Sequence, residues 1–390
     1  MITAHKIALD PNNVQATYFA RAAGTARFTY NWALAEWGRQ YEAHKLDPTL
    51  PRPSECALRR QLNAIKRDQF PWMTEVTKNA PQMAIRQLGV AFKNFFAGRA
   101  QYPKFRKKGV RDRFTITNDQ FDIDGNRIRI PILGWVRMRE KLRFSGKILS
   151  ATVSRVADRW FVSIAIDTPE PLPQAENQGA VGVDLGVRTL ATLSTGEKVV
   201  GPKAHKALLG RLRRLSRSLS RKVKGSANRK KAQMKLATLH ARIANVRSDA
   251  HHQLTTDLTR RFSVIGIEDL NVRGMASNRS LSRAVSDMGF FEFRQQMEYK
   301  AARRGGEVFV ADRWYPSSKT CSDCGHKVEE LPLKVEQWPC PVCGVVHDRD
   351  INAAINSMVL AASSAASACG ESEQSGLSLK QESSTEATYG

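Results

Sequence analysis

The chain has 390 residues, 42% of them hydrophobic, which is enough to bury a sizeable core and to form two or three domains. Its 61 Lys and Arg residues outnumber its 37 Asp and Glu residues, giving a formal net charge of +24, which indicates a polyanionic partner, nucleic acid first. A basic protein of the membrane surface is the alternative. However, the chain has no apolar run of about 18 residues and no secretory signal, which argues against a membrane-spanning protein and predicts a cytoplasmic one.

The N-terminal part of the chain reads as a strand followed by helices. Residues 3–9 predict the strand, and residues 10–12 supply a helix start with a side-chain cap. Apolar residues then recur at helical spacing to about residue 98. Within this region Lys78 and Gln82 carry donors and acceptors suited to base edges or phosphates. A solvated helix face is the alternative interpretation.

A basic segment with two aromatic residues follows at positions 102–108. Its composition is suited to phosphate contact with base stacking beside it. A solvated linker is the alternative. The candidate phosphate contacts are Lys104, Arg106, Lys107 and Lys108.

Short strands are predicted next, at residues 114–117, 127–130, 135–138, 148–156 and 159–166. They indicate a small barrel or sandwich. Because residues 3–9 also form a strand, the helices are interpreted as an insertion within this β domain. The Pro-containing stretch 168–178 predicts a linker.

The first candidate catalytic residue is Asp184. Residues 180–183 predict a buried strand that ends at this carboxylate, Gly186 permits a bend, and residues 189–193 predict a returning strand. At a strand end the carboxylate is accessible to a metal ion. Capping of a turn is the alternative role for a lone Asp in this position.

Residues 203–247 carry fifteen Lys or Arg and no Asp or Glu. Two leucine-rich stripes at helical spacing, separated by a turn at 225–228, predict a helical pair. Like charges along a helix repel by roughly a few tenths of a kcal/mol per pair. A nucleic-acid backbone would neutralise them. The candidate contacts are Arg214, Arg217, Arg221 and Lys222.

A second strand ending in a carboxylate is predicted at residues 264–268, where the last residue is Glu268. A helix at 290–304 and a strand at 307–311 follow. Two Cys-x-x-Cys pairs then occur with fifteen residues between them, which matches a structural zinc ribbon with four thiolate ligands. An iron–sulfur or redox site is the alternative, but no neighbouring motif favours it. The candidate ligands are Cys321, Cys324, Cys340 and Cys343.

The third candidate carboxylate lies directly after the ribbon, where a helix is predicted to begin. Asp348 occupies the expected N-cap and would be held on backbone amides, whereas Asp350 is free to project toward a metal. From about Ala361 the chain is rich in Ser, Ala, Glu and Gly, which predicts a disordered tail.

Asp184, Glu268 and Asp350 are separated by 84 and 82 residues, and their convergence would create a two-metal site. Mg²⁺ prefers oxygen ligands, and two Mg²⁺ ions bridged by carboxylates can activate a water for in-line attack on a phosphodiester. The sequence therefore predicts metal-dependent hydrolysis of nucleic acid.

The stretches around these three residues resemble the acidic motifs of a RuvC-like nuclease, which has the RNase H fold. Together with residues 316–325 and 348–354, their order resembles the TnpB family of transposon-encoded RNA-guided DNA nucleases, which is related to type V CRISPR effectors. Residues 26–31, 103–108 and 299–301 match as well. The resemblance covers residues 1 to about 360.

This resemblance implies a guide RNA from the transposon end and a double-stranded DNA target. It also implies a short target-adjacent motif read by the N-terminal half, cleavage of both strands by one active site, and a prokaryotic, nucleoid-associated location. A monomer is expected. Two alternatives are a DDE-type transposase and a catalytically silent RNA-guided repressor; the order of motifs argues against the first and the intact acidic triad against the second.

The expected fold class is α/β, with an RNase H-like (RuvC) nuclease domain that contains an inserted zinc ribbon and an N-terminal β-barrel domain that carries a helical insertion. The expected boundaries are residues 1–170 for the wedge-like barrel domain, with its helical insertion at about 12–100, then 178–315 for the first part of the nuclease domain, 316–346 for the ribbon, 347–361 for the last part of the nuclease domain and 362–390 for the disordered tail.

Overall fold

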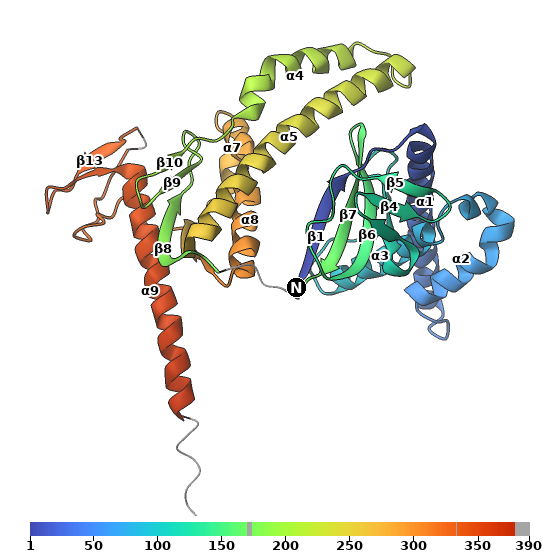
Figure 1. Cartoon of the computed structure of the whole chain (residues 1–390), viewed down its shortest axis with the longest axis horizontal. Coiled ribbons are helices and arrows are strands. Elements are labelled where there is room, and N and C mark those ends of the chain that lie inside the picture. Colours follow the sequence, from blue (N-terminus) through green and yellow to red (C-terminus); the bar gives the residue numbers. More distant parts are fainter. Residues whose placement is uncertain (170–173, 333, 379–390) are drawn as a thin grey trace, which may run out of the picture. The chain divides into compact units, whose positions relative to one another are not determined.

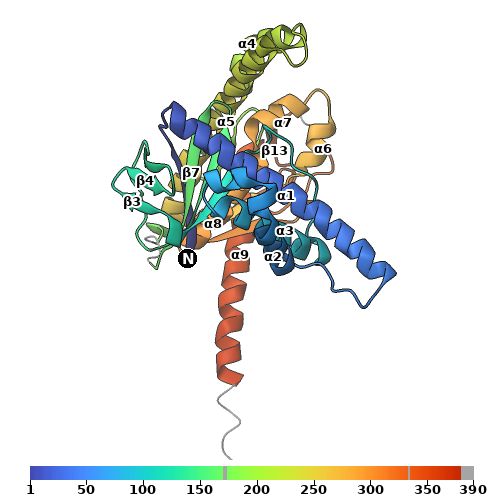
Figure 2. The ribbon, with the colours of Figure 1, turned by 90° about the vertical axis from the view of Figure 1, so that its right-hand side faces the viewer.

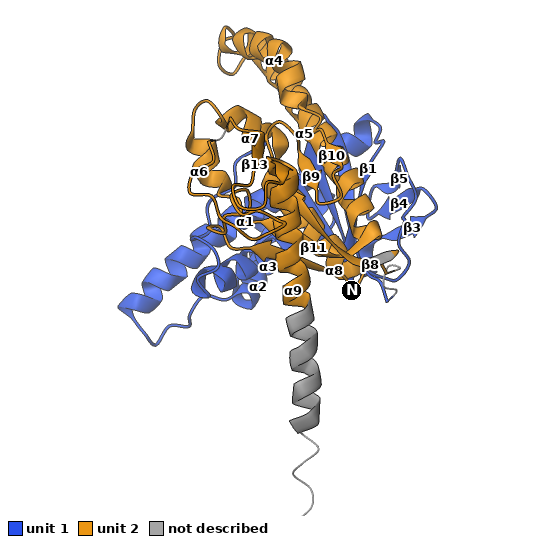
Figure 3. Ribbon diagram, turned by 90° about the vertical axis from the view of Figure 1, so that its left-hand side faces the viewer, with its two compact units in different colours: residues 1–170 blue, residues 171–390 orange. Residues whose placement is uncertain are grey.

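The computed structural model describes residues 1–169, 174–332 and 334–378. The chain divides into two compact units, Met1–Glu170 and Pro171–Gly390 (Figure 3). Among the described residues, no helix combines the length and the apolar character needed to cross a membrane.

In the first unit a run of helices follows the first strand in the sequence and precedes the second strand, and both strands belong to one sheet. Helix α1 begins at a capping box in which Asn12 and Gln15 each accept a hydrogen bond from the other's backbone N–H. The elements in chain order are β1 (Ile2–Ala8), α1 (Asn13–Leu46), α2 (Glu55–Gln69), η1 (Pro71–Glu75), α3 (Asn79–Phe96), β2 (Arg113–Thr117), η2 (Asn118–Gln120), β3 (Asp122–Asp124), β4 (Arg127–Ile130), β5 (Gly134–Arg137), β6 (Lys147–Val156) and β7 (Arg159–Asp167).

The strands of this unit form two sheets, with orders β1-β7-β6-β2 and β3-β4-β5. An isolated bridge between Leu9 and Met138 joins the chain after β1 to the chain after β5. Among the described residues no strand pairing closes the four-stranded sheet on itself, so the predicted barrel is not confirmed. The physical reason is that β3, β4 and β5 are short and each pairs with its neighbour in sequence, which leaves β1 and β2 as separate sheet edges.

The second unit is built on a five-stranded sheet of order β10-β9-β8-β11-β12. Strands β8, β11 and β12 are parallel to one another, while β9 and β10 are antiparallel to their neighbours. The elements are β8 (Asn177–Asp184), β9 (Ala191–Leu193), β10 (Lys198–Val199), α4 (Ala204–Ser220), α5 (Ala227–Arg261), β11 (Phe262–Glu268), α6 (Val272–Ser277), α7 (Ser282–Met288), α8 (Phe290–Arg303), β12 (Glu307–Ala311), β13 (Gln337–Pro339), β14 (Val346–Asp348) and α9 (Arg349–Ser378).

Two glycines allow helix α9 to lie directly on this sheet. A Cβ atom on Gly182 of β8 would overlap the carbonyl oxygen of Ala354, and one on Gly266 of β11 would overlap that of Ser357. Ala354 and Ser357 are both fully buried. Only a residue without a side chain permits this approach of backbone to backbone. The close packing fixes the start of α9 against β8 and β11. Figure 1 shows α9 beside β8.

Gly182→Ala is therefore expected to destabilise the second unit by about 1–3 kcal/mol or more, because the new methyl group meets backbone that cannot rotate away. Gly210→Ala is the matched control. That glycine lies inside α4, and outside its own helical turn no atom lies within 4 Å of the place that an alanine Cβ would take. Alanine there should stabilise the helix by roughly 0.5–1 kcal/mol. Urea unfolding of the two variants measures both effects, and equal midpoints for Gly182→Ala and the parent would refute the packing argument.

Helices α4 and α5 form the basic helical pair that the sequence predicts. Leu208, Leu212 and Leu215 of α4 pack against a small core to which α5 contributes Leu239 and Ile243. The two helices lie side by side, and their ends extend away from the sheet of their own unit (Figures 1 and 2). The turn between them contains Gly225 with a φ of 86°.

Helix α9 continues past residue 361, where the sequence predicts the start of a disordered tail. The structure is therefore helical up to Ser378, beyond the predicted start of the disordered tail. The physical reason is that this stretch is rich in alanine, the residue with the highest intrinsic helix propensity, so the helix needs no apolar stripe to continue. Residues 379–390, the rest of the predicted tail, lie outside the described residues.

Candidate active site and zinc ribbon

Asp184 and Glu268 are brought together by the pairing of β8 with β11. In this parallel pair Val183 lies opposite Ile267, so the residue after each of them occupies the same edge of the sheet. Both carboxylates are half-buried. The edge at which parallel strands end is the usual place for a site in an α/β sheet.

Asp350 reaches this edge from the first turn of α9. The preceding Asp348 is the cap: its Oδ1 accepts hydrogen bonds from the backbone N–H groups of Asp350 (3.2 Å) and Ile351 (3.1 Å), and its Oδ2 pairs with Lys198 Nζ at 2.7 Å. The N-cap role predicted for Asp348 is thus confirmed. The negative charge of Asp350 raises the pKa of Asp184, as expected for a third carboxylate near the first.

The electrostatics of this carboxylate cluster favour a bound cation. Burial raises the pKa of Asp184 well above its ordinary value, and the negative charges of Glu268 and Asp350 raise it further, with Arg349 acting in the opposite direction. Burial also raises the pKa of Glu268, opposed by a hydrogen bond from Ser317 and by Arg349. Partly buried like charges repel, and a divalent cation with oxygen ligands would relieve that repulsion.

The carboxylate oxygens are spread more widely than the ligands of a single ion. No oxygen set from Asp184, Glu268 and Asp350 lies within 4.8 Å of one another, whereas the four cysteine sulfurs do. The three acidic residues are the part of the chain that would hold magnesium.

The raised pKa of Asp184 predicts how stability depends on pH. A carboxyl whose pKa is higher in the folded state binds its proton more tightly there, so its contribution to folding stability falls as pH rises above the ordinary pKa near 3.8. At neutral pH this carboxyl should therefore contribute less to the stability of the Mg²⁺-free protein than it does near pH 4. Asp184→Asn should melt at a higher temperature than the parent at pH 7.5 without Mg²⁺, and the difference should vanish as pH approaches 4. Melting curves across pH test this, and a lower melting temperature for the variant at pH 7.5 would contradict it.

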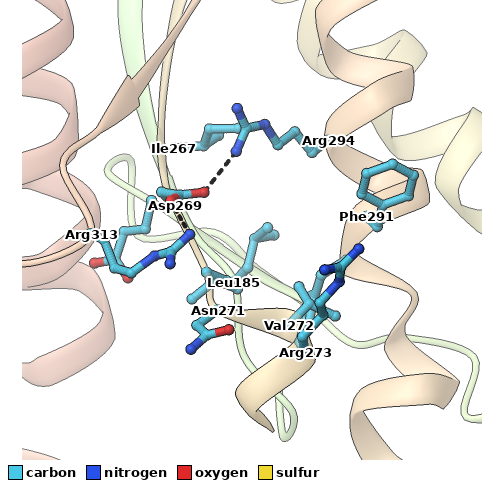
Figure 4. Close-up of a pocket in the computed structure, with 12 residues that line it drawn as sticks. Leu185, Ile267, Asp269, Asn271, Val272, Arg273, Phe291, Arg294 and Arg313 are labelled. Atoms are coloured by element: carbon cyan, nitrogen blue, oxygen red, sulfur yellow. Dashed lines mark hydrogen bonds and ion pairs between the residues drawn. The ribbon is translucent and has the colours of Figure 1, made fainter. Parts of the chain in front are cut away.

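Beside Glu268 lies a pocket of about 420 Å³ between the end of β11 and helix α8. Its lining includes Phe291, which is exposed, and three arginines, Arg273, Arg294 and Arg313 (Figure 4). Asp269 pairs with Arg294 at 2.9 Å and with Arg313 at 2.5 Å. The carboxylate next to Glu268 is thus neutralised and does not join the acidic cluster. Sequence reasoning missed these arginines because they follow Asp269 by 25 and 44 residues.

The four predicted zinc ligands come together through two turns of the same construction. In each turn the glycine after the second cysteine has a positive φ, and its N–H donates to the carbonyl of the first cysteine at 2.9 Å: Gly325 to Cys321 and Gly344 to Cys340. Only glycine adopts this backbone conformation without strain. The Cys-x-x-Cys-Gly pattern in the sequence is the signal for these turns.

The cysteine sulfurs have the spacing of a tetrahedral zinc site. Cys321 Sγ lies 3.6 Å from Cys343 Sγ, and Cys324 Sγ lies 3.6 Å from Cys340 Sγ. With Zn–S bonds of about 2.3 Å, the edges of a tetrahedron are about 3.8 Å long. The residues therefore fit one zinc ion with a closed set of four thiolates. His347, which the sequence did not single out as a ligand, is buried with Nε2 3.0 Å from Cys321 Sγ, the position of a second-sphere donor to that sulfur.

The nucleic-acid candidates of the first unit have different surroundings. Lys78 and Gln82 are exposed at the start of α3, and Lys104, Lys107 and Lys108 are exposed in the basic segment. These five side chains are free to meet a polyanion.

Arg106 differs from its basic neighbours because its guanidinium is already used inside the protein. It lies over the ring of Tyr30 at 3.6 Å and donates to Gln87 Oε1 at 3.0 Å, and burial lowers its pKa to about 10. Its backbone N–H donates to Asn31 Oδ1 (2.7 Å), and Asn31 Nδ2 donates to its carbonyl (2.9 Å). Desolvation and stacking therefore hold Arg106 as an anchor of the basic segment, and its role as a phosphate contact stays a prediction.

The basic candidates of the second unit are unpaired. Arg214, Arg217 and Arg221 are exposed and Lys222 is half-buried. Within the described part of the chain, no ion pair involves a Lys or Arg of residues 203–246. Carboxylates of the described residues therefore do not balance the charge of this surface.

The fold and the site define a mixed α/β protein with clustered carboxylates at a sheet edge and a four-cysteine ribbon. Residues 163–279 match a family described as a probable transposase (OrfB of IS605), residues 290–357 match the Cas12f1-like TNB domain, and residues 1–45 match a family described as a helix-turn-helix domain. In residues 1–45 the structure has β1 and then a single helix, most of α1.

Relatives with similar sequences cover nearly the whole chain. A protein of Streptomyces pristinaespiralis, provisionally named an RNA-guided DNA endonuclease, is 40% identical over 99% of this chain and 97% of its own. The similarly named InsQ of Escherichia coli K12 is 35% identical over 98% of this chain and 97% of its own. This chain therefore belongs to the TnpB family. The fold is similar to that in a cryo-EM structure of a Cas12f1–sgRNA–target DNA complex, with a TM-score of 0.59 and 15% identity over 89% of this chain and 83% of the other.

Proposed function

We propose that this protein is an RNA-guided DNA endonuclease that hydrolyses phosphodiester bonds with two Mg²⁺ ions held by Asp184, Glu268 and Asp350. The proposal is supported by the position of Asp184 and Glu268 at one edge of the sheet and by the raised pKa of Asp184, to which Asp350 contributes, in a chain of net charge +24. Such a cluster is unstable without cations and lies in a protein suited to a polyanionic substrate.

Each part of the site has a role in this reaction. Mg²⁺, when bound, supplies an activated water and stabilises the leaving 3′ oxygen. The carboxylates that would hold the ions come from two strand ends, those of β8 and β11, and from the start of α9. Arg349, whose charge acts on both Asp184 and Glu268, limits the repulsion between them. The four thiolates leave zinc no open position, so zinc holds structure and takes no part in the chemistry.

The guide and the target follow from the family. The names of the relatives assign them RNA-guided DNA cleavage, and this chain aligns with those relatives over nearly their full length. The guide RNA would come from the transposon end and direct the protein to double-stranded DNA next to a short target-adjacent motif. Exposed Lys78 and Gln82 in the N-terminal unit are the candidate readers of that motif.

Incubating the protein with a target plasmid, with and without co-expressed RNA and Mg²⁺, tests the proposal. Cleavage that needs both RNA and Mg²⁺ is the expected result. Strand joining in place of cleavage would favour a DDE-type transposase. Guided binding without cleavage would favour a silent repressor.

The basic helical pair of α4 and α5 leads to a prediction about salt dependence. Replacing Arg214, Arg217, Arg221 and Lys222 by Gln should weaken binding of RNA or of an RNA–DNA heteroduplex largely without regard to sequence. The slope of log K against log salt should fall by roughly 0.7 to 0.9 for each phosphate that the protein no longer neutralises. Filter binding at several salt concentrations measures this slope.

The matched control replaces four exposed basic residues that already have carboxylate partners, Arg39, Lys45, Arg127 and Arg139. Their charge is balanced locally, so the slope should change little. If the two quadruple variants behaved alike, the α4–α5 surface would not be the polyanion site.

A further inference from the structure

Two buried asparagines of α9 hold the segment of chain that leads into the zinc ribbon. Asn352 and Asn356 are 1% and 6% exposed and lie one helical turn apart on the same face. Asn352 Nδ2 donates to the carbonyls of Ser317 (3.2 Å) and Thr320 (2.7 Å), and Asn356 Nδ2 donates to the same two carbonyls at 2.7 Å each. Both side chains thus form hydrogen bonds to one short stretch of chain, residues 316–322.

The same stretch is attached to the first cysteine turn of the ribbon. Asn352 Oδ1 accepts a hydrogen bond from the backbone N–H of Ser322 at 2.9 Å, and Ser322 lies between Cys321 and Cys324. The amide of Asn352 therefore uses its acceptor and its donor group on the two ends of one segment. Asp350 precedes Asn352 by two residues, so the Asp350 carboxylate and the hydrogen bonds of Asn352 belong to the same turn of α9.

At its other end the stretch contacts the second carboxylate. The hydroxyl of Ser317, which is 4% exposed, donates a hydrogen bond to Glu268 Oε1. A single segment of chain consequently links Glu268 on β11, the turn that carries Asp350, and the cysteine turn of the ribbon.

We propose that Ser317, Asn352 and Asn356 are positioning residues that make assembly of the Mg²⁺ site depend on zinc in the ribbon. The inference deepens the proposed function and rests on it. Without zinc the Cys321 turn loses the bond that fixes it, and residues 316–322 then have no rigid support from which to orient Glu268 and α9. Removing a residue that orients a metal ligand typically lowers metal affinity or activity by about 10–100-fold.

Ser317→Ala tests the link to Glu268. The variant keeps every backbone contact of the segment and loses only the hydroxyl, so zinc content and RNA-guided DNA binding should match the parent. The Mg²⁺ concentration for half-maximal cleavage should rise by about 10–100-fold. The control is Ser318→Ala, which removes a hydroxyl from the next residue in the chain and should leave the Mg²⁺ requirement unchanged. A parental Mg²⁺ requirement in Ser317→Ala would overturn the inference.

Asn352→Asp tests the hydrogen bonds between Asn352 and the segment 316–322. The substitution is nearly isosteric, but it replaces an amide donor by a carboxylate that faces two carbonyl oxygens, which is unfavourable in a buried place. The rise in melting temperature on adding Mg²⁺, measured on the RNA-bound protein without any DNA, should be lost in this variant and kept in the parent. Because this variant could unfold the ribbon, zinc content is measured in parallel. Retention of both zinc and the Mg²⁺-dependent shift would count against the proposal.

Removing zinc tests the dependence directly. A mercurial thiol reagent releases zinc from thiolates without binding Mg²⁺, and the Mg²⁺-dependent rise in melting temperature should disappear as zinc is released. A Mg²⁺ effect that survives full zinc release would refute the coupling. The melting assay is independent of turnover: a parent that shows the Mg²⁺ shift but never cleaves guided targets would refute the proposed function and leave the coupling standing.

Discussion

Asp184→Ala, Glu268→Gln and Asp350→Ala are each expected to lower RNA-guided DNA cleavage by about a thousandfold or more while guided binding stays intact. Each change removes a metal ligand, and a catalytic metal contributes several kcal/mol of transition-state stabilisation, where every 1.4 kcal/mol is a factor of about ten. Binding should survive because the three side chains are acidic and add little to the attraction for nucleic acid. Cleavage of a target plasmid and gel-shift binding, with the same RNA-loaded preparation, measure the two effects separately.

Asp348→Ala is the control for this series, since it removes a carboxylate two residues from Asp350. Its carboxylate caps α9 and pairs with Lys198, so the loss should cost about 0.5–2 kcal/mol of stability and reduce cleavage only mildly. Parental cleavage by any of the three ligand variants would remove that residue from the site. A loss at Asp348 as deep as at Asp350 would show that the two roles had been assigned the wrong way round.

Local sequence patterns were sufficient to predict most of the elements that build the site. The apolar run that ends at Asp184, the second that ends at Glu268 and the capped start of α9 each carry their signal within about ten residues. The predicted strand at 307–311 coincides with β12, and the predicted helix at 290–304 agrees with α8 to within one residue. Periodicity and capping act locally, and so they can be read from one segment at a time.

Features that depend on contacts between distant segments could not be predicted in this way. Nothing near Arg106 in the sequence shows that its guanidinium stacks on Tyr30, 76 positions earlier, and its local context of Lys residues predicts an exposed charge. The hydrogen bonds from Asn352 to the carbonyls of Ser317 and Thr320 likewise depend on how α9 packs against the start of the ribbon. The one signal for it was the pair of asparagines at helical spacing in an otherwise apolar face.

The closure of a sheet is a second property that local patterns leave open. Alternation of apolar and polar residues predicts strands equally well for a barrel, a sandwich or separate sheets. In the first unit the result was decided by β3, β4 and β5, which pair among themselves in strands of three or four residues. Their turn chemistry at Gly125 favoured the local hairpin over a longer-range closure.

The double variant Cys321→Ser and Cys324→Ser is expected to lose its zinc and to unfold the ribbon well below the parental melting temperature. Two of four thiolates are removed, and the remaining core around Trp338 is small, with Cys321 and Cys340 among its buried members. In zinc-finger peptides a structural zinc ion contributes about 10–16 kcal/mol of apparent binding free energy, which is also folding free energy. Metal analysis of the purified protein, together with a thermal melt, measures zinc content and stability in the same sample.

Cys56→Ser is the matched control for the cysteine variant, because Cys56 is exposed in α2 and belongs to neither pair. It should keep the parental zinc content and melting temperature. Since the first cysteine turn also carries Ser322, which α9 holds through Asn352, loss of the ribbon should spread to the start of α9 and abolish cleavage as well. A double variant that retained its melting temperature, from a parent found to contain no zinc, would exclude the zinc ribbon and leave the four cysteines without a metal.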